Sequence, residues 1–295
     1  MTDAAIYEAS PIKRERATKA EMEERAEFLI AYAEEHGPVT VRGLYYQGEV
    51  AGLPGIDKTD SSYDKIQRQV LLLRRAGRLS YEDIADATRW MRKPRSYDSV
   101  EDALQATATL YRRNLWRDTN EYIEVWCEKD ALAGVIYPVT SQFDVPLMVT
   151  RGFSSETFAY EAIAQRGDDT RDYIVFYFGD FDRAGMDAAR SLEEKLKRFA
   201  KDKPFDVYFL HMAVTERTVK DFNLPTRPHK RKSPADKAWP YDYACELDAM
   251  PPDLLREIVR ACIEQYLPHD AYEVLKKAEA SEREALKAFV RERKK

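Results

Sequence analysis

The sequence predicts an α/β protein in which an α-rich N-terminal part precedes a parallel sheet. Helical segments separated by glycine and proline dominate the chain up to about residue 120. From Glu121 onward, short apolar runs rich in β-branched and aromatic residues alternate with helical segments. Such alternation is typical of a parallel sheet with helices on both faces. The length of 295 residues agrees with this division, because it exceeds one ordinary domain and suggests two.

The composition is that of a folded globular protein, with 44% apolar and 34% charged residues. No run approaches the roughly 20 apolar residues of a membrane helix, and the first residues lack the apolar core of a signal peptide. We therefore expect a cytoplasmic protein without a membrane partner. The three cysteines, Cys127, Cys245 and Cys262, are widely spaced, and we expect them to be reduced and buried.

The N-terminal part is expected to contain a flexible arm and three helices. The arm covers residues 1–17. The helices are expected around residues 18–36, 39–51 and 60–76, each ending near a glycine. After Gly77 the sequence indicates a turn and short strand-like pieces. Three helices followed by a β-rich tail are typical of a winged helix-turn-helix domain, which we place at residues 18–120 together with a further connecting helix.

The third of these helices is basic, which makes DNA a candidate partner. Lys65, Arg68, Arg74 and Arg75 are expected on its exposed side. Between Arg42 and Arg117 there are 14 Lys and Arg against 10 Asp and Glu, although the whole chain carries a net charge of −5. Phosphate contacts depend on local basic residues rather than on the total. The alternative is a solvated basic face without a ligand.

The second part is expected to hold four strands, which end near Glu128, Thr150, Phe178 and Val214. Four β/α repeats specify a parallel, doubly wound sheet, which we place at residues 121–269. The run from Tyr173 to Phe178 is almost continuously apolar, as in a strand covered on both faces. Residues 270–295 are expected to form a charged terminal helix.

Acidic residues follow two of the expected strands. Asp180 and Asp182 come directly after the third strand, Glu128 ends the first, and Gly152 follows the second. The carboxyl ends of parallel strands meet at one edge of a sheet, where ligands of this fold class bind. Carboxylate oxygens are ligands of Mg²⁺. These positions therefore predict a magnesium site, whereas the alternative is that the aspartates cap the next helix.

Two further acids, Glu246 and Asp248, precede a later helix. Glu246 either belongs to the acidic site or caps that helix, and the sequence slightly favours the cap. No GxxxxGK[ST] or GxGxxG segment occurs, so nucleotide hydrolysis by this chain is not expected.

Three motifs stand in a specific order: Arg42-Gly43-Leu44-Tyr45-Tyr46, then Glu128 in WCEKDALAG, then Asp180-Phe181-Asp182-Arg183-Ala184-Gly185. Over about residues 38–250 this order resembles the A subunit of type IIB DNA topoisomerases and the related transesterase that makes meiotic double-strand breaks. The chain looks most like topoisomerase mini-A, the compact, mobile-element-encoded version. It departs from the family at Arg183, where proline is frequent, and it carries no ATPase segment.

The resemblance implies a winged-helix domain that supplies a nucleophile and a Toprim domain that supplies acids. Tyr46 would attack DNA, forming a 5′-phosphotyrosyl link, and Arg42 would hold the scissile phosphate. Glu128, Asp180 and Asp182 would bind Mg²⁺, with Glu128 also catalytic. A tyrosine with a pKa of about 10 needs such charge neutralisation to act near neutral pH. The plainer interpretation is a core tyrosine, which we expect of Tyr45.

The resemblance also implies partners: double-stranded DNA, a second copy of the chain and, as an open possibility, a separate ATPase subunit. In the family the tyrosine and the metal come from different protomers, so a homodimer would cut both strands. Two alternatives stay open. One is a Toprim nuclease that uses metal-activated water and binds DNA through the winged helix. The other is a DNA-binding subunit without activity, against which the presence of Glu128, Asp180 and Asp182 speaks.

Overall fold

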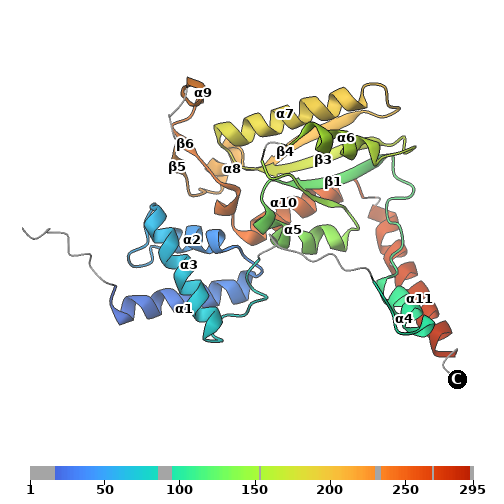
Figure 1. Ribbon diagram of the computed structural model, residues 1–295, viewed down its shortest axis with the longest axis horizontal. Coiled ribbons are helices and arrows are strands. Elements are labelled where there is room, and N and C mark those ends of the chain that lie inside the picture. Colours follow the sequence, from blue (N-terminus) through green and yellow to red (C-terminus); the bar gives the residue numbers. More distant parts are fainter. Residues whose placement is uncertain (1–16, 86–94, 153, 230–233, 268, 293–295) are drawn as a thin grey trace, which may run out of the picture.

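The protein is described by a computed structural model of the single chain, which covers residues 17–85, 95–152, 154–229, 234–267 and 269–292. Most of the expected N-terminal arm, residues 1–16, lies outside the described residues. Figure 1 shows the N-terminal helices on one side of the molecule, the sheet with its covering helices in the middle, and a pair of helices at the other end.

The three N-terminal helices are present as expected. They are α1 (Lys19–His36), α2 (Val41–Val50) and α3 (Asp60–Arg75). Each begins after a threonine whose hydroxyl accepts a hydrogen bond from a backbone N–H three residues later: Thr18, Thr40 and Thr59. Such N-caps satisfy donors that the first helical turn leaves free, so the sequence itself defines where these helices begin.

The strand-like tail of a winged helix is not confirmed. Within residues 77–85, β-type pairing is limited to an isolated parallel bridge between Val39 and Ile84. The remainder of the expected wing, residues 86–94, lies outside the part of the chain that the structure describes. Within the described residues the structure therefore shows a three-helix unit, and the winged helix stays a prediction.

The expected parallel sheet is present and has four strands. They are β1 (Glu121–Cys127), β2 (Leu147–Val149), β3 (Asp172–Gly179) and β4 (Val207–Ala213). The spatial order is β2-β1-β3-β4, and every neighbouring pair is parallel. In register, Cys127 lies beside Phe178 on β3, so β1 and β3 end side by side. The carboxyl ends of β1 and β3 point toward α2 (Figure 1). Glu128 and Asp180 directly follow these two ends.

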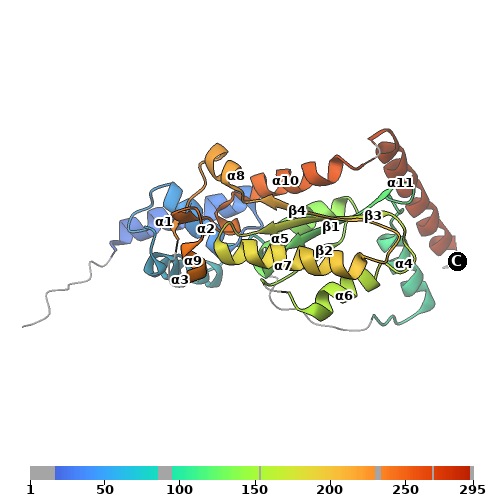
Figure 2. The same cartoon turned by 90° about the horizontal axis from the view of Figure 1, so that it is seen from above.

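Helices cover both faces of the sheet, as Figures 1 and 2 show. One face packs against α5 (Asp130–Gln142) and α10 (Pro252–Glu264), and the other against α6 (Glu156–Ala164) and α7 (Arg183–Ala200). Side chains alternate along β3: Ile174, Phe176 and Phe178 join the first core, whereas Tyr173, Val175 and Tyr177 join the second. This double burial explains why the strand is apolar at nearly every position.

The core under α5 and α10 continues into the N-terminal helices. Leu44, Tyr45 and Tyr46 of α2 belong to the same buried cluster as Leu247 and Ala249 of the short 3₁₀ helix η1 (Leu247–Ala249). Helix α2 packs directly on η1. This contact fixes α2 against the carboxyl edge of the sheet. The expected boundary at residue 120 stays a prediction.

The remaining elements flank the sheet. Helix α8 (Glu216–Asp221), the hairpin of β5 (Arg227–Pro228) and β6 (Tyr243–Ala244), and α9 (Pro234–Lys237) follow β4. The C-terminal helix α11 (His269–Glu292) packs along α4 (Val100–Leu110). The three cysteines are buried and unpaired, as expected. Among the described helices, none is long and apolar enough to cross a membrane.

Gly185 lies in the first turn of α7, where an added Cβ would stand 2.6 Å from the backbone oxygen of Asp180. We expect Gly185→Ala to lower the free energy of unfolding by about 1–3 kcal/mol, because backbone atoms must move to relieve the overlap. Denaturant unfolding measures this change. The neighbouring exposed residue provides a control, and Ala184→Ser should change stability by less than about 0.5 kcal/mol. Equal stability of the two variants would contradict the close packing of this turn.

Candidate functional site

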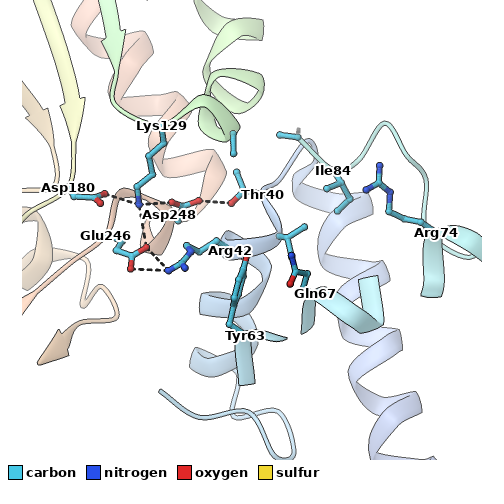
Figure 3. Close-up of a pocket in the computed structure, with 13 residues that line it drawn as sticks. Thr40, Arg42, Tyr63, Gln67, Arg74, Ile84, Lys129, Asp180, Glu246 and Asp248 are labelled. Carbon is cyan, nitrogen blue, oxygen red and sulfur yellow. Dashed lines mark hydrogen bonds and ion pairs between the residues drawn. The ribbon is translucent and has the colours of Figure 1, made fainter. Parts of the chain in front are cut away.

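A cleft of about 640 Å³ lies between the N-terminal helices and the carboxyl ends of β1 and β3. Figure 3 shows the side chains that line it. The polar and aromatic residues of the lining are Thr40, Arg42, Tyr63, Gln67, Arg74, Lys129, Asp180, Glu246 and Asp248. They come from α2, α3, the turn after β1, the turn after β3 and the segment around η1. The cleft therefore collects both signs of charge from segments that are far apart in sequence.

Lys129 is at the centre of this group (Figure 3). Its Nζ lies 3.0 Å from Asp180 Oδ1, 3.3 Å from Glu246 Oε2 and 2.8 Å from Asp248 Oδ2. Burial alone would lower the pKa of Lys129, but the charges of Asp248, Asp180 and Glu246 outweigh it and raise the pKa above its usual range. Lys129 is therefore a permanent cation that holds three carboxylates together.

Glu246 is the anion on which three cations converge. Its carboxylate accepts two hydrogen bonds from Arg42 Nη1, at 2.9 and 3.0 Å, and contacts Lys129 Nζ and, at 3.6 Å, Arg227 Nη1. Burial would raise the pKa of Glu246, but Lys129, Arg42 and Arg227 together lower it. The carboxylate stays charged because its partners replace the water that it lost.

The preference for Glu246 as a helix cap is wrong. Glu246 does precede η1, but within the described residues its side chain makes no capping hydrogen bond. The carboxylate points instead to Arg42 of α2 and to Lys129 in the turn after β1. Both partners lie far from Glu246 in the chain, so the local sequence does not reveal them. Glu246 therefore belongs to the charged site.

Asp248 joins the N-terminal helices to this site. Its side chain is almost fully buried, and Oδ1 accepts a hydrogen bond of 2.7 Å from the hydroxyl of Thr40. The same hydroxyl accepts a hydrogen bond of 2.8 Å from Gly43 N–H, as the N-cap of α2. One hydroxyl thus starts the helix and anchors it to the sheet edge. This connection fixes the position of Arg42, two residues further along.

The structure brings Glu128 and Asp180 together, as their positions at the carboxyl ends of parallel strands led us to expect. Glu128 Oε2 accepts a hydrogen bond of 3.1 Å from Asp180 N–H, and a Cβ added to Gly152 would stand 4.0 Å from Glu128 Oε1. Asp180 Oδ1 accepts a further hydrogen bond of 2.7 Å from Leu247 N–H. Burial raises the pKa of Asp180 to about 6, and Lys129 limits that rise.

Asp182 has different contacts from Glu128 and Asp180. Its Oδ1 caps α7 by accepting a hydrogen bond of 2.7 Å from Gly185 N–H, and its side chain lines a second cavity of about 310 Å³. Among the described residues, no group of three acids, histidines or cysteines has the geometry of a metal site. The alternative stated for the aspartates, a cap on the next helix, is therefore what the structure shows for Asp182.

The donor chemistry still fits Mg²⁺, because carboxylate oxygens at the end of a parallel sheet are the ligands this ion takes. At that edge a hydrogen bond joins the backbone N–H of Asp180 to the carboxylate of Glu128. Asp180 is shared with the ammonium of Lys129, so a bound cation and Lys129 would compete for the same carboxylate. Mg²⁺ binding by Glu128, Asp180 and Asp182 stays a prediction.

Tyr46 is buried in the core, with 1% of its surface exposed. Its hydroxyl has no hydrogen-bond partner among the described residues. Burial and the charge of Glu246 raise the pKa of Tyr46 above its usual range, and Arg227, Arg42 and Lys129 oppose that rise. The phenol therefore lies beside the charged group of its own chain, but it is shielded from solvent.

Tyr45 has the structural role expected of it. It is fully buried, and its hydroxyl donates a hydrogen bond of 2.8 Å to the backbone oxygen of Asp57. Arg42, in contrast, faces the cleft, where its guanidinium also lies 4.7 Å from the ring centre of Tyr63. Within the motif, Arg42 therefore faces the cleft, whereas Tyr45 and Tyr46 lie in the core.

The four candidate DNA contacts have different surroundings on α3. Arg68 and Arg75 are exposed, and Lys65 donates a hydrogen bond of 2.8 Å to the backbone oxygen of Gly55. Arg74 lines the cleft, and its guanidinium lies 4.2 Å from the ring centre of Tyr81. DNA binding by these residues stays a prediction.

Sequence reasoning missed Lys129, Asp248 and Arg227 as site residues. Lys129 directly follows Glu128 at a strand end, and that position was a usable signal. Asp248 lies two residues after Glu246, in a pair that was noticed but not assigned. Arg227 lies in a proline-rich and lysine-rich loop, where nothing distinguishes it from its basic neighbours.

The fold and the site define an α/β protein with a charged cleft at the carboxyl edge of a parallel sheet. In comparisons with known proteins, no protein-family model and no curated protein sequence matches this chain.

The raised pKa of Asp180 predicts how stability depends on pH without divalent cations. Its value of about 6 exceeds the usual 3.8, so ionisation of Asp180 opposes folding. The stabilisation that the neutral form of Asp180 provides is fully present below about pH 4 and is lost as the pH rises through 6. Asp180→Asn removes that cost, and we expect it to stabilise the protein by up to about 3 kcal/mol at pH 8 and little at pH 4.

Denaturant unfolding of wild type and variant at both pH values measures this difference. Asp64→Asn, at an exposed position of α3, is the control and should change stability by less than about 0.5 kcal/mol at either pH. A stability gain in Asp180→Asn that is equal at pH 4 and pH 8 would contradict the assigned pKa.

Proposed function

We propose that this protein is a Mg²⁺-dependent DNA-cleaving transesterase of the type IIB topoisomerase A-subunit type, with Tyr46 as its nucleophile. The observation that carries the proposal is the contact between Arg42 and Glu246, which attaches the helix of the tyrosine motif to the edge of the sheet that holds the acidic motif. Arg42 of the tyrosine motif and Asp180 of the acidic motif thus line the same cleft, although they lie far apart in the sequence.

The proposal includes the finer domain assignment and the partners. The three-helix unit within residues 18–120 would be the winged-helix domain, and the parallel sheet within residues 121–269 would be the Toprim domain. Double-stranded DNA would enter the cleft beside the basic helix α3, and two copies of the chain would cut the two strands. A separate ATPase subunit is compatible with this arrangement, because the chain itself has no nucleotide-binding motif.

The proposed reaction exchanges one phosphate ester for another. The hydroxyl of Tyr46 loses its proton to water, and its oxygen forms a bond to phosphorus. The bond from phosphorus to the 3′ oxygen breaks, and that oxygen takes a proton from water. Arg42 would bind the phosphate oxygens and offset the charge that develops on them. Mg²⁺ held by Glu128, Asp180 and Asp182 would supply further charge neutralisation at the phosphate.

The burial of Tyr46 adds a requirement to this mechanism. A shielded phenol without a hydrogen-bond partner among the described residues has to be uncovered before it attacks a phosphate. The contacts that cover it include the charged group around Glu246, which an incoming phosphate would compete with. We infer that the described conformation is the resting state and that DNA binding opens it.

A second candidate function is hydrolysis of DNA by metal-activated water. The burial of Tyr46 favours it, because a core tyrosine would be incidental to such a reaction, whereas Asp180 lines the open cleft. The three-helix unit would then serve DNA binding alone.

Tyr46→Phe separates the two functions. Supercoiled plasmid is incubated with protein and Mg²⁺ and then denatured, with and without protease digestion. We expect wild type to leave protein covalently attached to cut DNA, and Tyr46→Phe to lose the attachment at least about 100-fold, because the nucleophile is gone.

Tyr45→Phe is the matched control, since Tyr45 is the adjacent buried tyrosine. It removes one hydrogen bond, worth about 1 kcal/mol, and should retain the covalent product. Free 5′-phosphate ends produced by Tyr46→Phe at the wild-type rate would support hydrolysis and exclude the transesterase.

Asp180→Ala tests the acidic edge. We expect cleavage to be abolished, at least about 100-fold below wild type, while DNA binding in a mobility-shift assay persists, because Asp180 would act on the metal rather than on DNA affinity. Asp202→Ala, at an exposed position beyond the far end of α7, is the control and should cleave normally. Unchanged cleavage by Asp180→Ala would remove the metal site from the mechanism.

A further inference from the structure

Arg227 lies over the rings of both tyrosines of the motif, although 181 positions separate it from Tyr46. Its guanidinium carbon is 5.1 Å from the ring centre of Tyr46 and 5.5 Å from that of Tyr45. The residue belongs to β5, in the hairpin after the sheet, and its Nη1 lies 3.6 Å from Glu246 Oε1. Arg227 therefore connects the hairpin, the buried tyrosines and the charged group.

Arg227 has hydrogen-bonding capacity that its surroundings do not use. Its Nε and Nη2 are buried and have no hydrogen-bond partner among the residues that the structure describes, and the same holds for the hydroxyl of Tyr46. A buried donor without a partner costs about 1–3 kcal/mol, so such groups need an explanation. Unused donors and an unused hydroxyl on adjacent side chains point to a ligand that satisfies them.

A cavity of about 310 Å³ lies beside Arg227. Arg227, Asp182 and Glu246 all contribute to its lining. It therefore joins the guanidinium to one residue of the acidic motif and to the carboxylate that now binds Arg42. A tetrahedral phosphodiester has the charge and the acceptor oxygens that the free N–H groups require. Of the three cations that counteract the raised pKa of Tyr46, Arg227 has the largest effect.

We propose that Arg227 is a second phosphate-binding arginine of this site, which binds the oxygens of the phosphodiester that Tyr46 attacks. The inference rests on the proposed transesterase function. Glu246 occupies the position of the anion in the resting state, and the phosphate replaces it at Arg227 and Arg42. Arg227 stays protonated throughout, so it transfers no proton and acts by hydrogen bonds and charge alone. The same charge stabilises the Tyr46 phenolate as it forms.

The experiment measures the rate of covalent protein–DNA product at saturating DNA and Mg²⁺, for wild type, Arg227→Ala and Arg227→Lys. We expect Arg227→Ala to lower the rate by about 10² to 10³, as for the loss of one preorganised donor, with a much smaller change in DNA affinity. Millimolar guanidinium ion should restore part of this rate in Arg227→Ala and leave wild type unchanged. A residue with a purely structural role would show no such rescue.

Arg227→Lys keeps the charge beside Glu246 and guards against a variant that fails to fold. We expect it to unfold at the wild-type temperature and to form covalent product about tenfold more slowly, because an ammonium lacks the paired N–H groups of a guanidinium. Arg217→Ala is the matched control, since Arg217 is an exposed arginine of α8 paired with Asp221, and it should react at the wild-type rate.

The outcomes separate the two proposals. Covalent product at the wild-type rate in both Arg227 variants overturns the role of Arg227 and leaves the transesterase intact. A slow Arg227→Ala that guanidinium does not rescue, together with a fully active Arg227→Lys, reduces Arg227 to a structural counter-ion and also overturns the proposal. No covalent product in wild type overturns the transesterase and, with it, this inference.

Discussion

The ionic contact between Glu246 and its three cations is the constraint on which the rest of the site depends. Arg42, Lys129 and Arg227 come from a helix, a strand end and a hairpin, and each reaches the same carboxylate. Partly buried charges are stable only when paired, so removing one partner leaves the others uncompensated. The N-terminal helices are therefore held against the sheet by charge as well as by the continuous apolar core.

This arrangement explains why Tyr46 is shielded from solvent and yet lies beside the charged group around Glu246. The hydrogen bond from Thr40 to Asp248 and the pair between Arg42 and Glu246 fix α2, and Arg227 lies over the tyrosine rings. The contacts that bury the phenol thus also surround it with cations. An anion that competes with Glu246 would loosen the contacts that bury Tyr46. It would also bind the same cations.

Much of the fold was predictable because its signals are local. The apolar spacing and the glycines that follow identified α1 to α3, and the continuous apolar run of β3 identified a strand with two covered faces. The meeting of Glu128 with Asp180 followed from their positions at the carboxyl ends of two parallel strands. The wing stays a prediction, because residues 77–85 contribute only an isolated bridge and residues 86–94 lie outside the described part of the chain. Glu246 was wrongly favoured as a cap, since its partners lie over 100 positions away.

The sequence by itself determined the helices, the parallel sheet and the edge at which its acids gather, because capping, periodicity and chain direction are properties of neighbouring residues. Only the tertiary structure decided that Lys129 lies among three carboxylates and that Tyr46 is buried under Arg227. Those outcomes depend on packing between distant segments. Whether a charged side chain meets a partner, a ligand or water is settled by which segments share the space around it.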